Sequence, residues 1–286
     1  MKPQIKEIGN KPDKLIFTNP SQSRESTLIV EWGKRSLSFS VFHEQDNRVL
    51  HTDILEFEKE LIDFTKQDFN RFFKAHSIFG YSFEKTLCLV DTKYATLVPN
   101  DLFTTGENEE FLRFVHDLPS GNFTFPNEAI LSTDYQLIYA LPKLLQESLS
   151  KHFINVHYSI SQVSLLNYFS KFTQLDEFFG VHFNGDELFV FCYKESHLQF
   201  YNSFPYISSE DIVYNVLNVL NELGLSNERC VVYYTGMMPE DSAHIELLNQ
   251  YVKFLKPLER TNKLNYSTSV AATPSHYFIH HYASIL

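Results

Sequence analysis

Glycine and basic residues are both scarce in this chain of 286 residues. Nine glycines are present, and no segment has the pattern G-x-x-x-x-G-K-[ST], or G-x-G-x-x-G after a strand. Those motifs need glycine so that backbone amides can approach phosphate closely. The formal net charge is -11, and no run of Lys or Arg builds the surface that a phosphate backbone requires. Nucleic acid is therefore not an expected ligand.

Cysteines and long apolar runs are scarce as well. Cys88, Cys192 and Cys230 each lie in an apolar, strand-like run, where an unpaired thiol behaves as a small hydrophobic residue. No stretch approaches the roughly 18 uncharged apolar residues of a membrane span, and the N-terminus has no apolar segment of signal-peptide length. We therefore expect a cytoplasmic protein without a membrane span.

The sequence patterns of nucleophilic catalysis are also missing. Ser161, Ser164 and Ser208 have no G-x-S-x-G context, and none of the three cysteines has an identifiable histidine partner. We therefore expect no catalytic residues.

Three histidines near the C-terminus have one feature of a metal site. His276 and His280 have the i, i+4 spacing of a single helix face, and His281 follows them. No glutamate completes a His-Glu-x-x-His motif, and the cysteines are distant in sequence. A terminal helix over residues 276–286 with polar histidines is the favoured interpretation, and no metal site is expected.

What the chain has in abundance is apolar and aromatic residues. Hydrophobic residues make up 43% of the sequence, with 27 Phe and 16 Tyr. This is enough for one large domain or two medium ones with separate cores, and we expect two. Most aromatic residues should pack inside; the alternative is that one group lines a surface for a partner. That group is Tyr201, Phe204, Tyr206, Tyr233, Tyr234, Met237 and Met238.

A unit of three strands, a capped helix and a buried strand occurs twice, about 150 residues apart. In the first copy, Thr65 and Asp68 have the spacing of a helix capping box; in the second, Ser208 and Asp211 have it. The predicted strands of the first copy are 27–32, 36–42, 49–57 and 86–90, with 36–42 half-buried because polar and apolar residues alternate. Those of the second copy are 178–183, 187–193, 197–204 and 230–234. Between the copies, residues 91–126 are predicted to form loops around one helix, 108–116.

Five segments carry a resemblance to known proteins. They are the hairpin 27–42, Leu97-Val98-Pro99, the run 137–142, Ser209-Glu210-Asp211, and the run 231–236. In this order they resemble the duplicated ribonuclease-H-like lobes of the actin, sugar kinase and heat-shock chaperone ATPase superfamily. More narrowly, they resemble the family called domain of unknown function 3822.

The resemblance implies an α/β fold of two ribonuclease-H-like lobes, each a mixed five-stranded sheet with helices, facing each other across a cleft. The expected divisions are a flexible N-terminal arm over residues 1–25, lobe I over 26–174 and lobe II over 175–286.

The resemblance also implies where nucleotide would bind. The first hairpin of the superfamily carries Asp-x-Gly followed by Ser or Thr, so that amides hold phosphate and the Asp organises Mg²⁺. Here Glu31, Trp32, Gly33 and Lys34 occupy those positions. The bulky Trp32 and the missing small hydroxyl residue leave little room for close backbone approach.

The second hairpin departs further from the family pattern. His182 and Asn184 stand where another Asp-x-Gly is expected, and only Gly236 remains of the glycine pair at the adenosine motif. Imidazole is a poor substitute for the hard oxygen ligands that Mg²⁺ prefers.

We therefore predict a non-catalytic, pseudo-ATPase scaffold without cofactor that binds another protein. The alternative is an ATPase or small-molecule kinase that binds Mg-ATP; a third hypothesis is a homodimer or filament component. The cofactor-binding residues under the Mg-ATP alternative would be Glu31, Gly33, Lys34, Asn184, Gly185 and Gly236.

Overall fold

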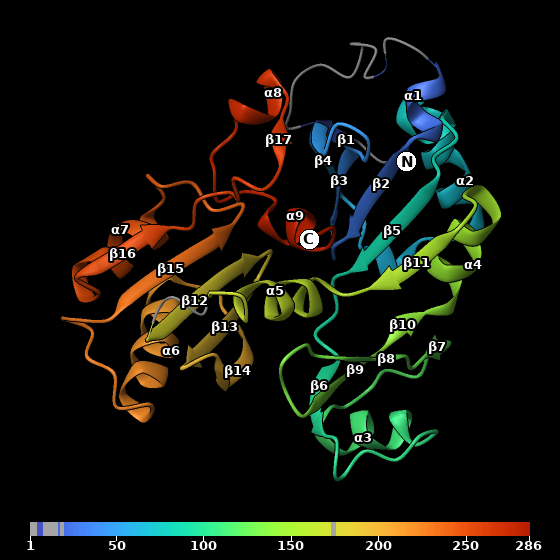
Figure 1. The fold of residues 1–286 in the computed structure, drawn as a ribbon. Helices are drawn as coiled ribbons and strands as arrows, with labels where there is room; N and C mark the ends of the chain where they lie inside the picture. The colour runs from blue at the N-terminus through green and yellow to red at the C-terminus, as the bar shows by residue number, and fades with distance from the viewer. Residues whose placement is uncertain (1–4, 8–16, 18–19, 173–175) are drawn as a thin grey trace. The chain divides into compact units, whose positions relative to one another are not determined.

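The computed structural model describes residues 5–7, 17, 20–172 and 176–286 (Figure 1). The chain divides into two compact units, each discontinuous in sequence. Unit 1 comprises Met1–Ala129, Asp134–Val163 and Asn262–Ala272, and unit 2 comprises Ile130–Thr133, Ser164–Thr261 and Thr273–Leu286. Much of the predicted arm over 1–25 lies outside the described residues, and the lobe limits at 26, 174 and 175 stay predictions.

Unit 1 is built on a mixed sheet with the strand order β1-β4-β3-β2-β5-β11, and β17 also pairs with β4. The antiparallel meander of β2, β3 and β4 was expected from the first copy of the repeat. β5 is parallel to β2, and β11 is parallel to β5. The strands are β1 (Ile5–Glu7), β2 (Ser26–Trp32), β3 (Ser36–His43), β4 (Arg48–Phe57), β5 (Lys85–Val90), β11 (Val156–Ser159) and β17 (Asn265–Tyr266).

The strand β3 is buried along almost its whole length, so the prediction that it is half-buried is wrong. Ser38 and Ser40 are 2% and 0% exposed, like the apolar residues between them. A buried hydroxyl is tolerated where it is hydrogen-bonded, and the Ser38 hydroxyl donates to the Glu31 carboxylate. Residue alternation alone cannot distinguish such a strand from one with a solvated face.

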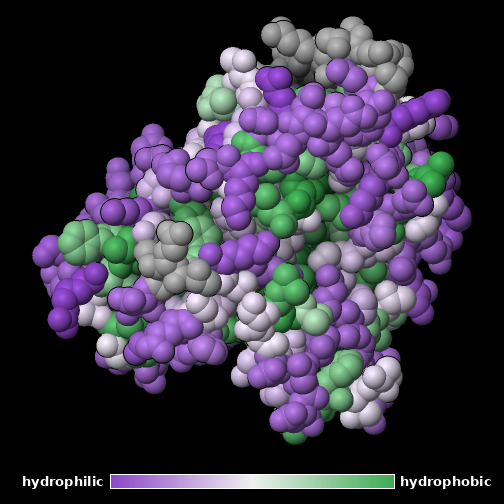
Figure 2. Space-filling view, in the orientation of Figure 1, coloured by the Kyte–Doolittle hydropathy of each residue, from purple (hydrophilic) through white to green (hydrophobic). Residues whose placement is uncertain are grey.

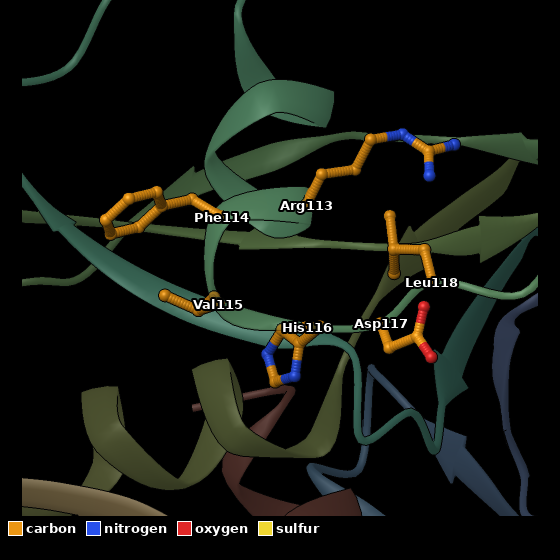
Figure 3. A pocket seen from close by; sticks show the side chains of 6 residues that line it. All are labelled: Arg113, Phe114, Val115, His116, Asp117 and Leu118. Carbon is orange, nitrogen blue, oxygen red and sulfur yellow. The ribbon is translucent and has the colours of Figure 1, made fainter.

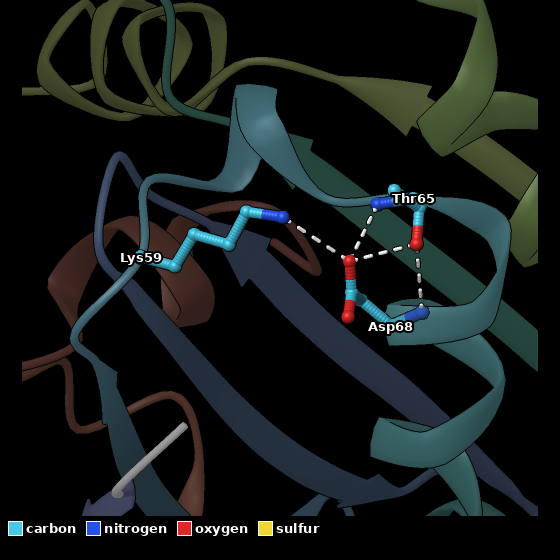
Figure 4. A network of polar contacts seen from close by, with 3 residues as sticks. All are labelled: Lys59, Thr65 and Asp68. Carbon is cyan, nitrogen blue, oxygen red and sulfur yellow. Dashed lines mark hydrogen bonds and ion pairs between the residues drawn. The ribbon is translucent and has the colours of Figure 1, made fainter. Parts of the chain in front are cut away.

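The helix α2 (Lys66–Ala75) covers the sheet of unit 1 with an aromatic face. It begins at the predicted capping box: the Thr65 hydroxyl accepts from the Asp68 amide, and Asp68 Oδ2 accepts from the Thr65 amide at 2.8 Å. Lys59 adds an ion pair of 3.2 Å to the same carboxylate (Figure 4). Phe69, Phe72 and Phe73 of this helix are buried.

A small sheet interrupts unit 1, and one of its strands, β6, lies within the stretch 91–126 that was predicted to form loops. β6 (Ala95–Pro99), β9 (Tyr135–Tyr139) and β8 (Asn127–Ala129) form a three-stranded antiparallel sheet. The helix α3 (Asn108–Val115) lies where a helix was expected. We call residues 91–142 the inserted region; its core consists of Val98, Leu112, Leu118, Ile138 and Ala140. Pairing between β6 and β9, 36 or more positions apart, overrode the local turn signals around Pro99.

The remaining elements of unit 1 are short connections and a second covering helix. They are α1 (Pro20–Arg24), the 3₁₀ turns at Leu61–Asp63 and Ser77–Gly80, the pair β7 (Phe123–Thr124) and β10 (Leu141–Pro142), α4 (Lys143–His152) and α8 (Thr268–Ala271). The helix α5 (Ser161–Phe169) leads from unit 1 into unit 2.

Unit 2 has the five-stranded order β14-β13-β12-β15-β16. Its antiparallel meander is followed by two parallel strands, as in unit 1. The strands are β12 (Glu177–Asn184), β13 (Glu187–Lys194), β14 (His197–Pro205), β15 (Val231–Gly236) and β16 (Phe254–Pro257). The order β4-β3-β2-β5-β11 of unit 1 is therefore repeated, which confirms the predicted mixed five-stranded plan, with β1 and β17 added to it in unit 1.

The helix α6 (Ser209–Glu222) of unit 2 begins at the predicted residues. Ser208 and Asp211 form a second capping box. Gly224 has φ +67°, and the Leu225 amide donates to the Leu220 carbonyl at 2.8 Å, which closes the helix at its C-terminus. Ile212, Val216 and Leu220 of α6 pack in the core of the unit, together with residues of α7 (Ala243–Tyr251).

The C-terminal segment is less helical than predicted. Only α9 (Ile279–Ala283) is helical, because Phe278 adopts a left-handed conformation with φ +55° just before it. His276 therefore lies outside the helix that contains His280, and the expected i, i+4 pair on one helix face does not form. No helix among the described residues is long and apolar enough to cross a membrane.

Candidate functional site

The carboxyl ends of the parallel strands in unit 1 bring several polar residues together. Glu31 is the last residue but one of β2, and it pairs across the ladder with Leu89 of β5. Asp91 directly follows β5, and its amide donates to the Trp32 carbonyl at 2.8 Å. Ser161 comes two residues after β11. Such strand ends are where α/β folds commonly place ligand residues.

Glu31 is buried at this edge, with 4% of its surface exposed. The Ser38 hydroxyl donates to Oε2 at 3.2 Å, and the Ser161 hydroxyl donates to Oε1. Burial, reinforced by the Glu31 charge, raises the pKa of the neighbouring Cys88 thiol well above its usual value. Both carboxylate oxygens of Glu31 therefore already accept hydrogen bonds from the protein.

The tip of the first hairpin is fixed to the segment that follows β4. The Gly33 amide donates to the Ser36 carbonyl at 2.9 Å. The carbonyls of Lys34 and Arg35 accept from the amides of Leu61 and Phe57 at 2.9 and 2.7 Å. The exposed Arg35 guanidinium forms an ion pair with Glu60 at 3.0 Å. Lys34 is exposed.

The prediction that Trp32 obstructs close approach to the hairpin is wrong. Its ring is 1% exposed and packs against α2, with ring centres 5.4 Å from Phe69 and 5.7 Å from Phe72. Successive side chains of a strand point to opposite faces, so Trp32 faces away from Glu31. Trp32 therefore fills the core of unit 1 and does not crowd the hairpin.

In unit 2 a buried imidazole, His182, lies at the position where the resemblance implies a second carboxylate. His182 is 1% exposed, and its Nδ1 lies 2.7 Å from the Thr235 hydroxyl. The same hydroxyl also lies 3.5 Å from the Val181 carbonyl oxygen. The rings of Phe189 and His280 lie 5.8 and 5.0 Å from His182.

The other three candidate residues of unit 2 lie together at the carboxyl ends of β12 and β15. Asn184 ends β12, and Gly185 begins the turn with φ +59°. The hairpin loop is Gly185-Asp186, because Asn184 still pairs with Glu187. The Tyr206 hydroxyl donates to the Gly185 carbonyl at 2.6 Å.

Gly236 ends β15 with φ +97°. A Cβ at this position would lie 2.1 Å from the Phe183 carbonyl oxygen. The close approach of β15 to β12 therefore explains this glycine without any ligand. The structure thus places Glu31, Gly33 and Lys34 at the carboxyl end of β2 in unit 1. It places Asn184, Gly185 and Gly236 at the carboxyl ends of β12 and β15 in unit 2.

The C-terminal histidines belong to the interior and not to a polar surface helix. His276, His280 and His281 are 0%, 1% and 0% exposed. His276 Nε2–H donates to the Met238 carbonyl at 2.9 Å, and burial lowers the pKa of this imidazole. Sequence reasoning expected polar, exposed side chains here, since histidine occurs in both settings.

Two further polar residues at the edge of unit 1 were not singled out from the sequence. Ser161 was considered only as a nucleophile. Its position just after a strand and at the start of α5 is one where a side chain can reach a neighbouring strand end, and its hydroxyl donates to Glu31. Glu128 of β8 accepts from the Tyr139 hydroxyl at 2.9 Å, and burial raises the pKa of its carboxyl. Tyr139 lies on the neighbouring strand β9, and no sequence motif indicates this hydrogen bond.

The family described as a protein of unknown function, DUF3822, matches residues 17–255. The chain belongs to this family. The matched range includes all six candidate residues of the nucleotide alternative and excludes the three C-terminal histidines. No curated protein matches the chain.

Solved structures give the fold. A Bacteroides thetaiotaomicron protein with actin-like ATPase fold and unknown function is 18% identical, with a TM-score of 0.71 over 90% of this chain and 98% of that one. A PilM-PilN type IV pilus biogenesis complex contains a chain that is 9% identical, with a TM-score of 0.58 over 91% of this chain and 97% of that one. The predicted family and actin-like fold are confirmed.

Proposed function

We propose that this protein is a non-catalytic scaffold of actin-like fold that binds another protein. The observation that carries the proposal is the environment of Glu31. This side chain stands where the superfamily has its Mg²⁺-organising carboxylate, yet it is buried and accepts hydrogen bonds from Ser38 and Ser161. Mg²⁺ usually keeps several waters and needs open coordination positions, so a carboxylate engaged in this way is better suited to holding strands together.

The chemistry of unit 2 supports the same proposal. His182 offers a nitrogen where Mg²⁺ requires oxygen, and its Nδ1 is engaged with Thr235. Gly236 is accounted for by the backbone of Phe183. The PilM-PilN complex is a precedent for a chain of this fold that assembles with another protein.

The alternative function is binding of Mg-ATP, as an ATPase or small-molecule kinase. One observation favours it: two carboxylates, Glu31 and Asp91, lie at the same strand edge, with Asp91 Oδ2 3.8 Å from the Cβ position of Gly33. In that case Glu31 would coordinate Mg²⁺ and Lys34 would contact phosphate. Gly33 would belong to the same phosphate site, and Gly236, with Asn184 and Gly185, would lie on the nucleotide side of unit 2.

Thermal unfolding with and without 1 mM Mg-ATP, repeated with Mg-ADP, distinguishes the two functions. A site filled at about 100 times its Kd would stabilise the folded state by about 2.7 kcal/mol, a readily measured change in Tm. We expect no change with either nucleotide. A stabilisation that Glu31→Gln and Lys34→Ala remove would overturn the scaffold proposal and support nucleotide binding.

The control for this experiment is the stability of the variants without ligand. Lys34 is exposed, so Lys34→Ala should leave Tm unchanged. Glu31→Gln retains one oxygen acceptor for a serine hydroxyl and should lower stability by about 1–3 kcal/mol. A homodimer and a cytoplasmic location stay predictions from the sequence.

A further inference from the structure

The helix α3 of the inserted region has two unlike apolar sides. Leu112 is fully buried in the core of the inserted region, and the partly buried Phe111 packs beside it. Two residues beyond Leu112, about 200° around a helix, Phe114 points the other way. Phe114 is 90% exposed, and the adjacent Val115 is 52% exposed.

The exposed side continues into a shallow hollow lined by the last residues of α3 and the segment after it. Its lining is Arg113, Phe114, Val115, His116, Asp117 and Leu118 (Figure 3). His116 holds this segment in place, because its Nε2 lies 2.9 Å from the Ala95 carbonyl of β6. We call Phe114, Val115 and this hollow the α3 surface. Single exposed apolar residues are common, but here two neighbours adjoin a concavity.

The α3 surface has an acidic rim: Asp117 lines the hollow, and Glu107 and Glu110 lie about two turns and one turn of the helix before Phe114. Residues 101–117 contain five carboxylates and one arginine. Arg113 forms an ion pair with Glu109 at 2.8 Å, which leaves Asp101, Glu107, Glu110 and Asp117. These four are exposed, and within the described part of the chain no ion pair engages them. Glu110 is one helical turn before Phe114, so charge and ring are neighbours on the helix.

The acidic charge of the α3 surface favours one kind of binding partner over a membrane or a second copy of the chain. An anionic membrane would be repelled by the four carboxylates. A two-fold dimer through the same patch would oppose identical acidic rims, at a cost in repulsion. A segment with apolar residues on one side and cations beside them can pack against the Phe114 ring and form ion pairs with the carboxylates of the rim. Figure 2 shows apolar residues scattered among hydrophilic ones over the inserted region.

We propose that the α3 surface is the docking site for a basic amphipathic helix of a partner protein. Phe114 and Val115 would contact apolar residues of that helix at i, i+3, i+4 and i+7, and Glu107, Glu110 and Asp117 would face its Lys and Arg. This inference rests on the proposed protein-binding function and specifies where and by what chemistry the partner binds.

The test is selection of a random 16-residue helical peptide library against the full chain, followed by fluorescence anisotropy of the selected peptides. We expect enriched peptides to be basic and amphipathic, and Phe114→Ser to weaken their binding about tenfold, as loss of a central aromatic contact does. The double variant Glu107→Gln/Glu110→Gln should weaken binding several-fold and reduce its dependence on salt.

Matched controls keep the result interpretable. Ile207 of unit 2 is 97% exposed, so Ile207→Ser removes an equally exposed apolar side chain from another surface and should not alter binding. Because Phe114 is exposed, Phe114→Ser should leave Tm unchanged. No enrichment, enrichment of acidic or neutral peptides, or binding insensitive to Phe114→Ser would each overturn the docking site. None of these results depends on nucleotide, so failure here is distinguishable from stabilisation by Mg-ATP.

Discussion

The sheets of the two units have the same strand order but are covered by different chemistry. In unit 1, α2 places Phe69, Phe72 and Phe73 against Trp32. In unit 2, α6 places aliphatic residues, Ile212, Val216 and Leu220, against the sheet. Both helices nevertheless begin at a capping box with the same geometry. The shared plan is thus specified by strand order and helix caps, whereas each core is filled in its own way.

The strand ends differ as much as the cores do. In unit 1 a buried carboxylate, Glu31, is held by two serine hydroxyls. In unit 2 a buried imidazole, His182, is held by a threonine hydroxyl. In both units the polar group at the strand end is therefore hydrogen-bonded to hydroxyl groups of the protein itself. Substitutions in the two units test this comparison.

The largest effect is expected from Trp32→Ala in the aromatic core of unit 1. Removal of a fully buried ring should lower the free energy of unfolding by about 3–5 kcal/mol, because the cavity is bordered by rigid phenylalanine rings. Hydrogen exchange measured by mass spectrometry should show the loss of protection in β2, β5 and α2 and little change in β12–β15. If Trp32 instead obstructed a ligand site, the variant would gain nucleotide binding with little loss of stability.

Much of this architecture could be predicted because its determinants are local. The capping residues Thr65 and Ser208 are each three positions from their partners, and Gly224 needs only its own φ to end α6. Glu31 could be placed at a strand end, but its partner Ser161 is 130 positions away. The pairing of β6 with β9 and the burial of His276 likewise depend on contacts between distant segments. Neither hydrophobic periodicity nor a short sequence motif indicates contacts between distant segments, so these features could not be predicted from the sequence.

A smaller effect is expected when alanine replaces the glycines at the strand ends. Gly236→Ala should lower the free energy of unfolding by about 3 kcal/mol, because φ is +97° and the new Cβ would overlap the Phe183 carbonyl. Gly33→Ala in unit 1 should cost about 1 kcal/mol or less, because the nearest atom, at 2.8 Å, is a serine hydroxyl that can rotate. Urea denaturation of both variants measures the difference.

Gly185→Ala is the matched control within unit 2. Its φ is +59°, but no atom lies within 4 Å of the new Cβ, so only backbone strain remains, about 1–2 kcal/mol. Equal costs at Gly185 and Gly236 would show that the contact with Phe183 is unimportant and that the positive φ alone accounts for Gly236.

The smallest effect concerns the two capping carboxylates. Hydrogen bonds from the Thr65 amide and hydroxyl lower the pKa of Asp68, and Lys59 lowers it further. Hydrogen bonds from the amides of Ile207 and Ser208 lower the pKa of Asp211. Since both carboxyl pKa values lie below those of the unfolded chain, the stability they contribute is present above the ordinary Asp pKa. It is lost as pH falls through the lowered values.

Salt should affect the two capping carboxylates differently. Lys59 contributes to the lowered pKa of Asp68, whereas the lowered pKa of Asp211 comes from hydrogen bonds to amides and a hydroxyl. Raising the ionic strength to 1 M, or the substitution Lys59→Gln, should raise the pKa of Asp68 and leave that of Asp211 unchanged. Carboxyl-carbon NMR titration of the full chain measures both values in one sample. The two capping hydroxyls should contribute equally to stability, so Thr65→Ala and Ser208→Ala should each lower the free energy of unfolding by about 1 kcal/mol. If salt moved both pKa values equally, the Lys59 pair would have no specific role, and the two caps would be electrostatically equivalent.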